Sequence, residues 1–261
     1  MAFRAFNPSG LARFNSATSS NLLSAYENHV SAQLIFDRNQ TPHRAIAPSS
    51  FRCPRRSWFR LRGTKPDQVT EIDYELEFTA RAGTAFHRMI QSDLKDMLGD
   101  NWVSVDDWVA RQQFDYKYTL TPAEDSLETF VEIEYPPIRF ACDGIIFWEN
   151  KYWLLEIKTI DNILFKALDE PREEHEAQVT CYATYLNLDG VLFMYLDRWY
   201  GRIKCYEVDI PEYRKADIRS KVAQLLDLTK SNLVPDPLPK GDKWCSTQYC
   251  PYFKTCGEYG R

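Results

Sequence analysis

The sequence predicts an α/β fold. Runs rich in β-branched and aromatic side chains, as expected of strands, lie at residues 138–148, 151–160, 191–197 and 203–210. Apolar side chains at helical spacing, as expected of amphipathic helices, lie at residues 81–98, 173–188 and 211–228. Because strands and helices alternate over the second half of the chain, sheet and helices are expected to share one core.

Length and composition favour one central unit with two extensions. The chain has a mass of 30.6 kDa and is 44% hydrophobic, enough for a substantial core, and no stretch approaches the roughly 18 apolar residues of a membrane span. We expect an N-terminal helical extension at 1–48, with an amphipathic helix at 21–36, a core at 49–231 and a tail at 232–261. A soluble protein is expected.

Residues 138–148 and 151–160 predict a β-hairpin, because Glu149-Asn150 interrupts two strand-forming runs. A turn centred there places Asp143 directly opposite Glu156, and Lys158 opposite Ala141 on the same face. Facing side chains are roughly 4.5–5.5 Å apart, so two carboxylates could hold one divalent ion. The alternative for Glu156 and Lys158 is an ordinary ion pair at the rim of a sheet.

Two helices add polar groups turned toward the core. His87 lies in the apolar arc of the helix at 81–98, which Gly83-Thr84 is expected to start. It is a candidate ligand, or a core histidine with one hydrogen bond. In the helix at 173–188, three polar side chains share one stripe, and they form either part of an active site or a buried hydrogen-bond network: His175, Gln178 and Tyr182.

Seven cysteines without a secretory signal indicate a reducing compartment. Three of them lie in strand or helix patterns and are expected to be small buried hydrophobes: Cys142, Cys181 and Cys205. The other four, near prolines, are typical of metal ligands: Cys53, Cys245, Cys250 and Cys256. On spacing alone, a zinc site and an iron–sulfur cluster are equally compatible with them.

In combination, these motifs resemble the PD-(D/E)XK nuclease superfamily, and specifically its RecB-like exonuclease branch. The residues that carry the resemblance follow the family's order along about residues 50–261: Gly83-Thr84-x-x-His87, Asp143, Glu156-Ile157-Lys158, and His175-x-x-Gln178-x-x-x-Tyr182. One cysteine before this core and three after it are similar to the iron–sulfur subgroup, which includes AddB-like and CRISPR-associated spacer-acquisition exonucleases. Four residues separate Cys245 from Cys250, where family members commonly have two.

The resemblance implies a restriction-endonuclease-like core, with a central mixed sheet flanked by helices and a C-terminal cysteine-ligated metal clasp closing on Cys53. It implies that Mg²⁺ or Mn²⁺ is held by His87, Asp143, Glu156 and the carbonyl of Ile157, while Lys158 orients the attacking water. Gln178 and Tyr182 would position the substrate or the lysine. It also favours a 4Fe–4S cluster over zinc at the four cysteines.

The expected function is hydrolysis of phosphodiester bonds by a metal-dependent deoxyribonuclease, most simply an exonuclease acting on single-stranded DNA or DNA ends. The overall charge is −5, but binding depends on local basic surface, and the expected DNA contacts are Arg55, Arg56 and Arg60, interleaved with Phe51, Trp58 and Phe59. The alternative is that these arginines form a solvated or ion-paired face.

Two other functions stay open: a catalytically silent nucleic-acid-binding or scaffolding protein, and another metal-dependent hydrolase using the same carboxylates. A zinc-stabilised endonuclease is a further variant of the nuclease reading. Expected partners are DNA and a helicase, integrase or recombination protein, with no membrane. The expected location is the cytoplasm of a bacterium or archaeon, or the host of a phage that encodes the chain.

Overall fold

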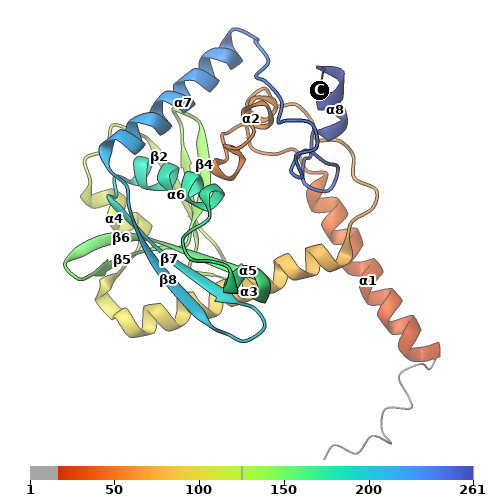
Figure 1. Ribbon diagram of the computed structural model, residues 1–261, viewed down its shortest axis with the longest axis horizontal. Helices are drawn as coiled ribbons and strands as arrows, with labels where there is room; N and C mark the ends of the chain where they lie inside the picture. The colour runs from red at the N-terminus through yellow and green to blue at the C-terminus, as the bar shows by residue number, and fades with distance from the viewer. Residues whose placement is uncertain (1–16, 125, 261) are drawn as a thin grey trace, which may run out of the picture.

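The computed structural model describes residues 17–124 and 126–260, and within them it is an α/β fold with two sheets (Figure 1). The larger sheet has the strand order β1-β5-β6-β7-β8, and the smaller has β2-β3-β4. The strands are β1 (Trp102–Val103), β2 (Tyr118–Pro122), β3 (Thr129–Ile133), β4 (Ile138–Cys142), β5 (Gly144–Trp148), β6 (Lys151–Ile160), β7 (Gly190–Asp197) and β8 (Ile203–Asp209). The expected α/β class, with a mixed sheet flanked by helices, is confirmed.

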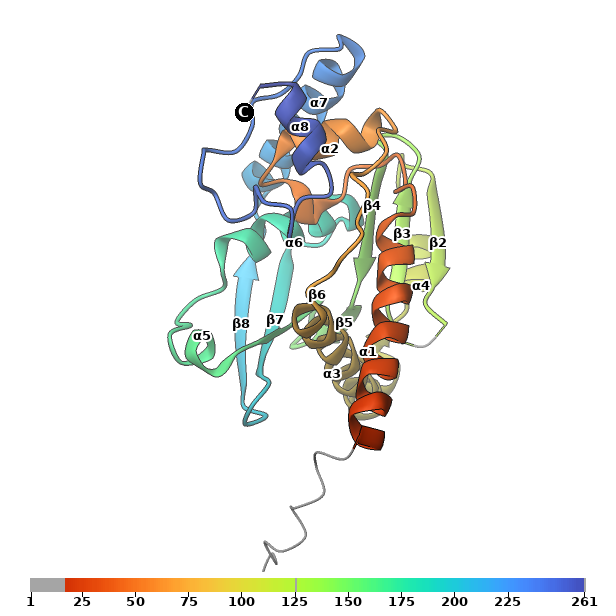
Figure 2. The ribbon, with the colours of Figure 1, turned by 90° about the vertical axis from the view of Figure 1, so that its right-hand side faces the viewer.

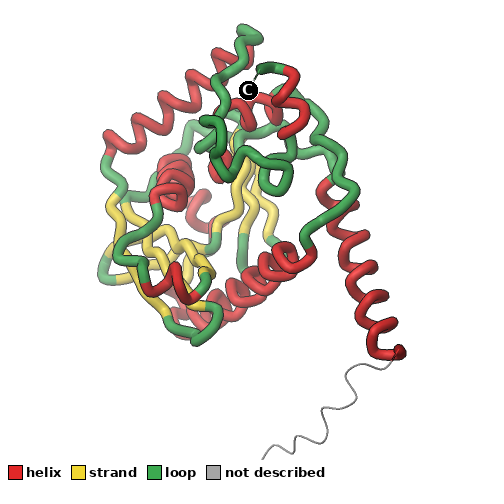
Figure 3. Tube along the Cα trace, turned by 45° about the vertical axis from the view of Figure 1, so that its right-hand side comes forward, coloured by secondary structure: helices red, strands yellow, loops and turns green. Residues whose placement is uncertain are grey.

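The helices are α1 (Ala17–Arg38), α2 (Pro54–Leu61), α3 (Tyr74–Leu98), α4 (Val105–Arg111), α5 (Asn162–Lys166), α6 (Glu173–Leu186), α7 (Glu212–Lys230) and α8 (Phe253–Glu258), with 3₁₀ turns η2 (Pro48–Ser50) and η3 (Gly99–Asn101). Figure 3 shows that these helices surround the strands, apart from α1, which extends away from them. The expected helix at 21–36 lies within α1, and residues 1–16 of the expected extension lie outside the described residues. Among the described helices, none is long and apolar enough to cross a membrane.

The larger sheet is mixed because its strands are joined in two ways. Strands β5 and β6 are antiparallel, and their two-residue turn has φ of 49° at Glu149 and 63° at Asn150, the left-handed pair that a tight hairpin turn requires. Strands β6 and β7 are parallel, so the chain crosses over between them through α5 and α6. Strand β8 returns antiparallel to β7 at the edge.

The expected continuous strand at 138–148 is wrong, because the chain changes sheet at Asp143. Residues before it pair with β3 in the smaller sheet, and residues after it pair with β6 in the larger one. Ala141 therefore faces Phe130, and the expected pairing of Lys158 with Ala141 does not occur. The predicted hairpin register does hold from Gly144–Leu155 to Trp148–Lys151. Its extension by one residue brings Asp143 beside Glu156, as expected.

Helix α3 covers one face of the larger sheet. Ile90 packs there with Leu155 and Ile157 of β6. The helix begins at Tyr74 instead of near Gly83-Thr84, because the Asp73 side chain caps it by accepting the Leu76 amide hydrogen at 3.0 Å.

Gly83 lies buried in the middle of α3, where it allows close approach to β6. A Cβ at this position would come within 2.8 Å of Thr159 Oγ1. The last turn of the helix buries Leu98, while Met97 is 66% exposed.

Helix α6 covers the opposite face of the larger sheet, so the sheet is enclosed between α3 and α6 (Figure 2). Val179 and Ala183 of α6 are fully buried in the main core with Leu154 and Phe193 of the sheet. The C-terminal tail then returns to the segment around α2, where Phe59 stacks on Tyr252 with ring centroids 5.2 Å apart. The ends of the core are thus adjacent, close to the α6 side of the molecule.

Candidate active site

Asp143 lies at the junction of the two sheets, which turns its carboxylate toward β6 and α3. Its side chain is 8% exposed, and Oδ2 accepts the amide hydrogen of Ile157 at 2.7 Å. Gln91 of α3 donates to the Asp143 carbonyl at 2.8 Å, which ties the helix to the junction. The bend that breaks the strand therefore also fixes the carboxylate, because both its main chain and its side chain are bonded.

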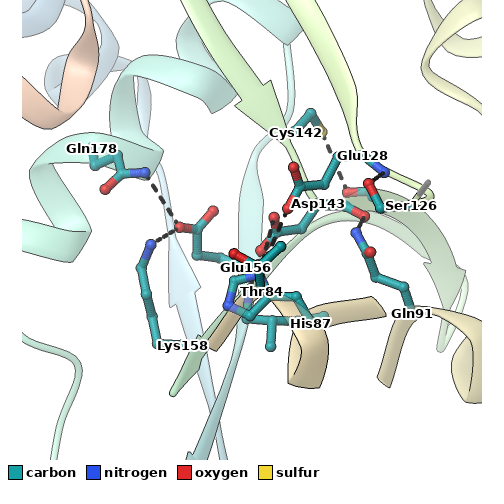
Figure 4. A network of polar contacts seen from close by, with 12 residues as sticks. Thr84, His87, Gln91, Ser126, Glu128, Cys142, Asp143, Glu156, Lys158 and Gln178 are labelled. Atoms are coloured by element: carbon teal, nitrogen blue, oxygen red, sulfur yellow. Dashed lines mark hydrogen bonds and ion pairs between the residues drawn. The ribbon is translucent and has the colours of Figure 1, made fainter. Parts of the chain in front are cut away.

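His87 and Glu128 complete a group with Asp143 (Figure 4). The His87 Nδ1 atom is 3.7 Å from Asp143 Oδ1 and 3.8 Å from Glu128 Oε1. One ligand atom from each of the three residues lies within 4.8 Å of the other two, a spacing suited to a metal ion. His87 is thus beside Asp143, as expected, on the buried side of α3.

Glu128 was not among the residues expected in the site. It precedes β3, whose register with β4 pairs Thr129 with Cys142. One further step along this ladder brings Glu128 beside Asp143. The signal was present in the sequence, since the runs at 129–133 and 138–142 flank a Pro-containing turn and form a hairpin.

Glu156 and Lys158 form an ion pair on the α6 face of β6. Gln178 Nε2 lies 3.4 Å from the same Glu156 oxygen that the lysine contacts, and 2.5 Å from the Tyr182 hydroxyl. Gln178 and Tyr182 were expected to position the substrate or the lysine, and in the structure Gln178 contacts Glu156. Glu156 is not one of the three residues that lie at metal spacing.

Ile157 presents its main-chain amide to Asp143, and its side chain is buried on the α3 face. The neighbouring Glu156 side chain points to the α6 face, because successive side chains of a strand alternate. Asp143 therefore approaches β6 through the Ile157 amide, whereas the Glu156 carboxylate projects from β6 toward α6. The role expected of the Ile157 carbonyl as a ligand stays a prediction.

The site holds more negative than positive charge. Three carboxylates, those of Glu128, Asp143 and Glu156, face one ammonium and one imidazole. Burial lowers the pKa of His87, but the carboxylates of Asp143 and Glu128 outweigh this effect and raise it to about 9. Burial raises the pKa of Glu156 to about 7, although Lys158 acts in the opposite direction. A divalent cation would favour the charged form of the carboxylates, and it could replace the proton on His87.

His175 does not contact the acidic group. Its Nδ1 is 2.9 Å from the hydroxyl of Tyr195 on β7, and the two rings are stacked. Burial, with added repulsion from Lys158 and Arg172, lowers the pKa of His175 to about 3, so the ring is neutral at physiological pH. Three polar residues were expected on one stripe of this helix. Gln178 contacts Glu156 and Tyr182, whereas His175 contacts Tyr195 instead.

The four cysteines expected to hold a metal line a single cavity of about 1410 Å³: Cys53, Cys245, Cys250 and Cys256. Lys158 and Gln178 line the same cavity, which therefore connects the cysteines to the active site. Burial raises the pKa of the Cys53 and Cys250 thiols. Among the described residues, the cysteines do not form a group at the 4.8 Å spacing found at His87.

Of the cysteines expected to be buried, Cys142 and Cys181 are, whereas Cys205 is exposed. The prediction for Cys205 is wrong because β8 is an edge strand, where one face of the strand is open.

The expected DNA-binding arginines lie in or beside α2, but Arg55 is buried and serves the fold. Its guanidinium donates to the carbonyls of Pro235 at 2.6 Å and Gly260 at 2.9 Å, and to Cys256 Sγ at 3.6 Å. The expected phosphate contact of Arg55 is therefore wrong in this structure.

The Nε atoms of Arg56 and Arg60 are buried without a partner among the described residues. Trp58 and Phe59 are each 1% exposed, so they belong to the core and cannot stack on bases.

Comparison with known proteins gives no family assignment. No family model matches the chain, and no curated protein matches it. Among solved structures, that of SSO0001 is 17% identical, with a TM-score of 0.43, 93% of this chain covered and 97% of that one. The structure of LHK-Exo in complex with dAMP is 13% identical, with a TM-score of 0.45 and coverages of 69% and 79%. Likenesses this weak carry no functional argument, so the functional case rests on the site.

Proposed function

We propose that this chain is a divalent-metal-dependent deoxyribonuclease, an exonuclease acting on single-stranded DNA or DNA ends. The observation that carries the proposal is the half-buried group His87–Glu128–Asp143, whose imidazole and two carboxylates lie at a spacing that could hold one metal ion. The Glu156–Lys158 pair lies on the strand that binds Asp143. Carboxylates and imidazole are suitable ligands for Mg²⁺ or Mn²⁺, and the imidazole favours Mn²⁺.

Each residue around the proposed ion has a different role. A bound Mg²⁺ or Mn²⁺ would supply Lewis-acid chemistry and lower the pKa of water. Asp143 is held in place by the Ile157 amide, and Gln178 limits the freedom of Glu156. Lys158, with Glu156 as its counter-ion, would orient the attacking water and place positive charge beside the developing charge on the phosphate. Burial lowers the pKa of Lys158, but Glu156 and Asp143 outweigh this and raise it, so the amine is charged.

The test is cleavage of end-labelled single-stranded DNA with Mn²⁺, Mg²⁺ or chelator. Activity should require the metal and be lost in Asp143→Ala and Lys158→Ala. Lys151→Ala is the matched control, because Lys151 lies on the same strand but pairs with Asp209. Circular DNA substrate separates exonuclease from endonuclease activity. Binding of DNA without cleavage by wild type would instead support the catalytically silent alternative, and neither binding nor cleavage would support another hydrolase.

We also propose that the four cysteines hold a 4Fe–4S cluster. Thiols are the ligands such clusters use, and the tail is held against Cys53 by contacts that need no metal, including Asp67 with Thr255. A four-cysteine zinc site, with each sulfur about 2.3 Å from the metal, is the alternative that metal analysis distinguishes. Anaerobically purified protein should be brown with about four irons per chain, whereas a colourless protein with one zinc would contradict the proposal.

A further inference from the structure

The turn between β7 and β8 exposes aromatic side chains that nothing in the described chain covers. We define the aromatic tip as residues 198–203. Within it, Trp199 is 77% exposed, Tyr200 65% and Ile203 48%. Figure 2 shows this turn at the free end of the β7–β8 hairpin, with α5 alongside. Exposed aromatic rings so close together are unfavourable in water, which indicates a ligand.

The aromatic tip is fixed by hydrogen bonds. The Asp197 carbonyl accepts from the Gly201 amide at 2.9 Å, and the Asp197 amide donates to the Arg202 carbonyl at 2.8 Å. The Asp197 carboxylate accepts from the Trp199 amide at 2.9 Å and from the Asn162 side chain at 2.8 Å. Gly201 has φ of 64°, a conformation that favours glycine and closes the turn. The rings therefore stand on a preorganised turn.

The tip itself carries two arginines and no carboxylate. Arg198 and Arg202 belong to the tip, and the Arg202 guanidinium lies 5.0 Å from the centre of the Tyr200 ring. Lys166 is exposed at the end of the neighbouring α5. The one carboxylate of the turn, Asp197, is buried and bonded to the turn itself. Arginine beside exposed aromatic rings suits a ligand with phosphates and accessible base faces, a combination that unpaired nucleic acid offers and a duplex hides.

The position of the tip relates it to the active site. Parallel pairing sets Lys158 of β6 beside Tyr195 of β7, and Ile160 beside Asp197. Trp199 follows four residues after Tyr195, and the chain turns after Asp197, so the two backbones are at most about 13 Å apart, the length of four extended residues. This limit corresponds to about four nucleotides at the ~3.4 Å rise of a stacked strand. Side chains alternate along a strand, so Asp197 and Lys158 point to the same face of the sheet. The Asp197 carboxylate accepts from the Trp199 amide and so holds the turn at that face.

From this arrangement we infer that the aromatic tip is a stacking site for unpaired bases of single-stranded DNA, a few nucleotides from the bond that is cut. Trp199 and Tyr200 stack on the bases, while Arg198 and Arg202 contact the phosphates. The inference rests on the proposed nuclease function for the identity of the reacting site. It adds to that function the position of the DNA strand on the protein surface.

Two measurements test the inference, both with the full-length protein as purified, wild type and variants. The first is fluorescence anisotropy of a labelled 12-nucleotide DNA in chelator, so that binding is read without cleavage. Trp199→Ala with Tyr200→Ala should weaken binding by about 30-fold, and Trp199→Phe should restore part of it, since stacking contributes about 1–3 kcal/mol per base. The control Trp148→Ala removes a 46% exposed tryptophan at the turn between β5 and β6, where binding should not change.

The second measurement is photocrosslinking of DNA with 5-iodouracil at single positions. The inference expects crosslinks to Trp199 or Tyr200, confined to one or two neighbouring positions. It is overturned if the double variant binds like wild type, or if the variant loses only self-association in sedimentation analysis, which would assign the tip to a second copy of the chain. A wild type that binds DNA through the tip but never cleaves it would refute the nuclease proposal and leave this inference standing.

Discussion

At the residue scale, the site depends on a few side chains whose neighbours come from distant parts of the sequence. Glu128 shows this most clearly, because it lies in the loop before β3 and reaches His87 on α3. His175 shows the opposite case: it was expected either in the active site or in a buried hydrogen-bond network, and its hydrogen-bond partner is Tyr195. Replacing either residue tests the role that the structure gives it.

Replacing Glu128 by Gln should lower the affinity for Mn²⁺ by about ten-fold or more, because the amide keeps the shape and removes the charge. Calorimetric titration of the protein with MnCl₂ measures the change. Glu124→Gln is the control, since Glu124 is exposed in the same loop. Equal affinities in the two variants would mean that Glu128 is no ligand.

His175 should make stability fall with acidification. Its folded-state pKa of about 3 lies below the unfolded value, so below about pH 6.5 the unfolded chain binds a proton that the folded chain does not. The contribution is complete above pH 6.5 and is lost progressively between pH 6.5 and 3. Denaturant unfolding from pH 4 to 8 should show a smaller acid-side slope in His175→Asn, by up to about 1.4 kcal/mol per pH unit. Parallel curves for wild type and variant would contradict this.

At the element scale, the contact between α3 and β6 sets the position of the histidine. Gly83 faces Thr159 Oγ1 so closely that the helix and the strand have no room for a methyl group. The distance of His87 from Asp143 therefore depends on a glycine one turn before it on the same helix. In the middle of a helix, glycine is otherwise unfavourable.

Gly83→Ala should shift α3 away from β6 and weaken Mn²⁺ binding several-fold, even though alanine has the better helix propensity. Thr159→Ala removes the β6 atom that the added Cβ would meet, so the double variant should regain affinity. Metal titration and thermal unfolding of the three variants measure both effects. Unchanged binding in Gly83→Ala would show that the helix tolerates the methyl group.

At the scale of the whole molecule, Arg55 joins α2 to the C-terminal part of the chain. It is 5% exposed and reaches the loop after α7 and the last turn of the tail. The tail also packs Tyr259 against Trp58, with centroids 5.9 Å apart. The cysteines are thus brought to one cavity by protein contacts as well as by any metal they bind.

Arg55→Ala should destabilise the protein by about 3 kcal/mol and release the tail, because two buried carbonyls would lose a charged donor. Denaturant unfolding and limited proteolysis of the C-terminus report the two effects. Arg52→Ala is the control, since its ion pair with Asp242 is on the surface and contributes little to stability. A tail that resists proteolysis in Arg55→Ala would show that other contacts hold it.

The sequence by itself determined most of α1, α3, α6 and α7, the strands β6, β7 and β8, and the register of the β5–β6 hairpin. These follow from local periodicity and from a turn that only certain residues adopt. It also identified Asp143, Glu156, Lys158 and His87 by type and order. Only the tertiary structure decided the change of sheet at Asp143, the arrival of Glu128, the burial of Arg55 and the exposure of Trp199. Each of these depends on which distant segment packs against a residue, and local pattern carries no information about that partner.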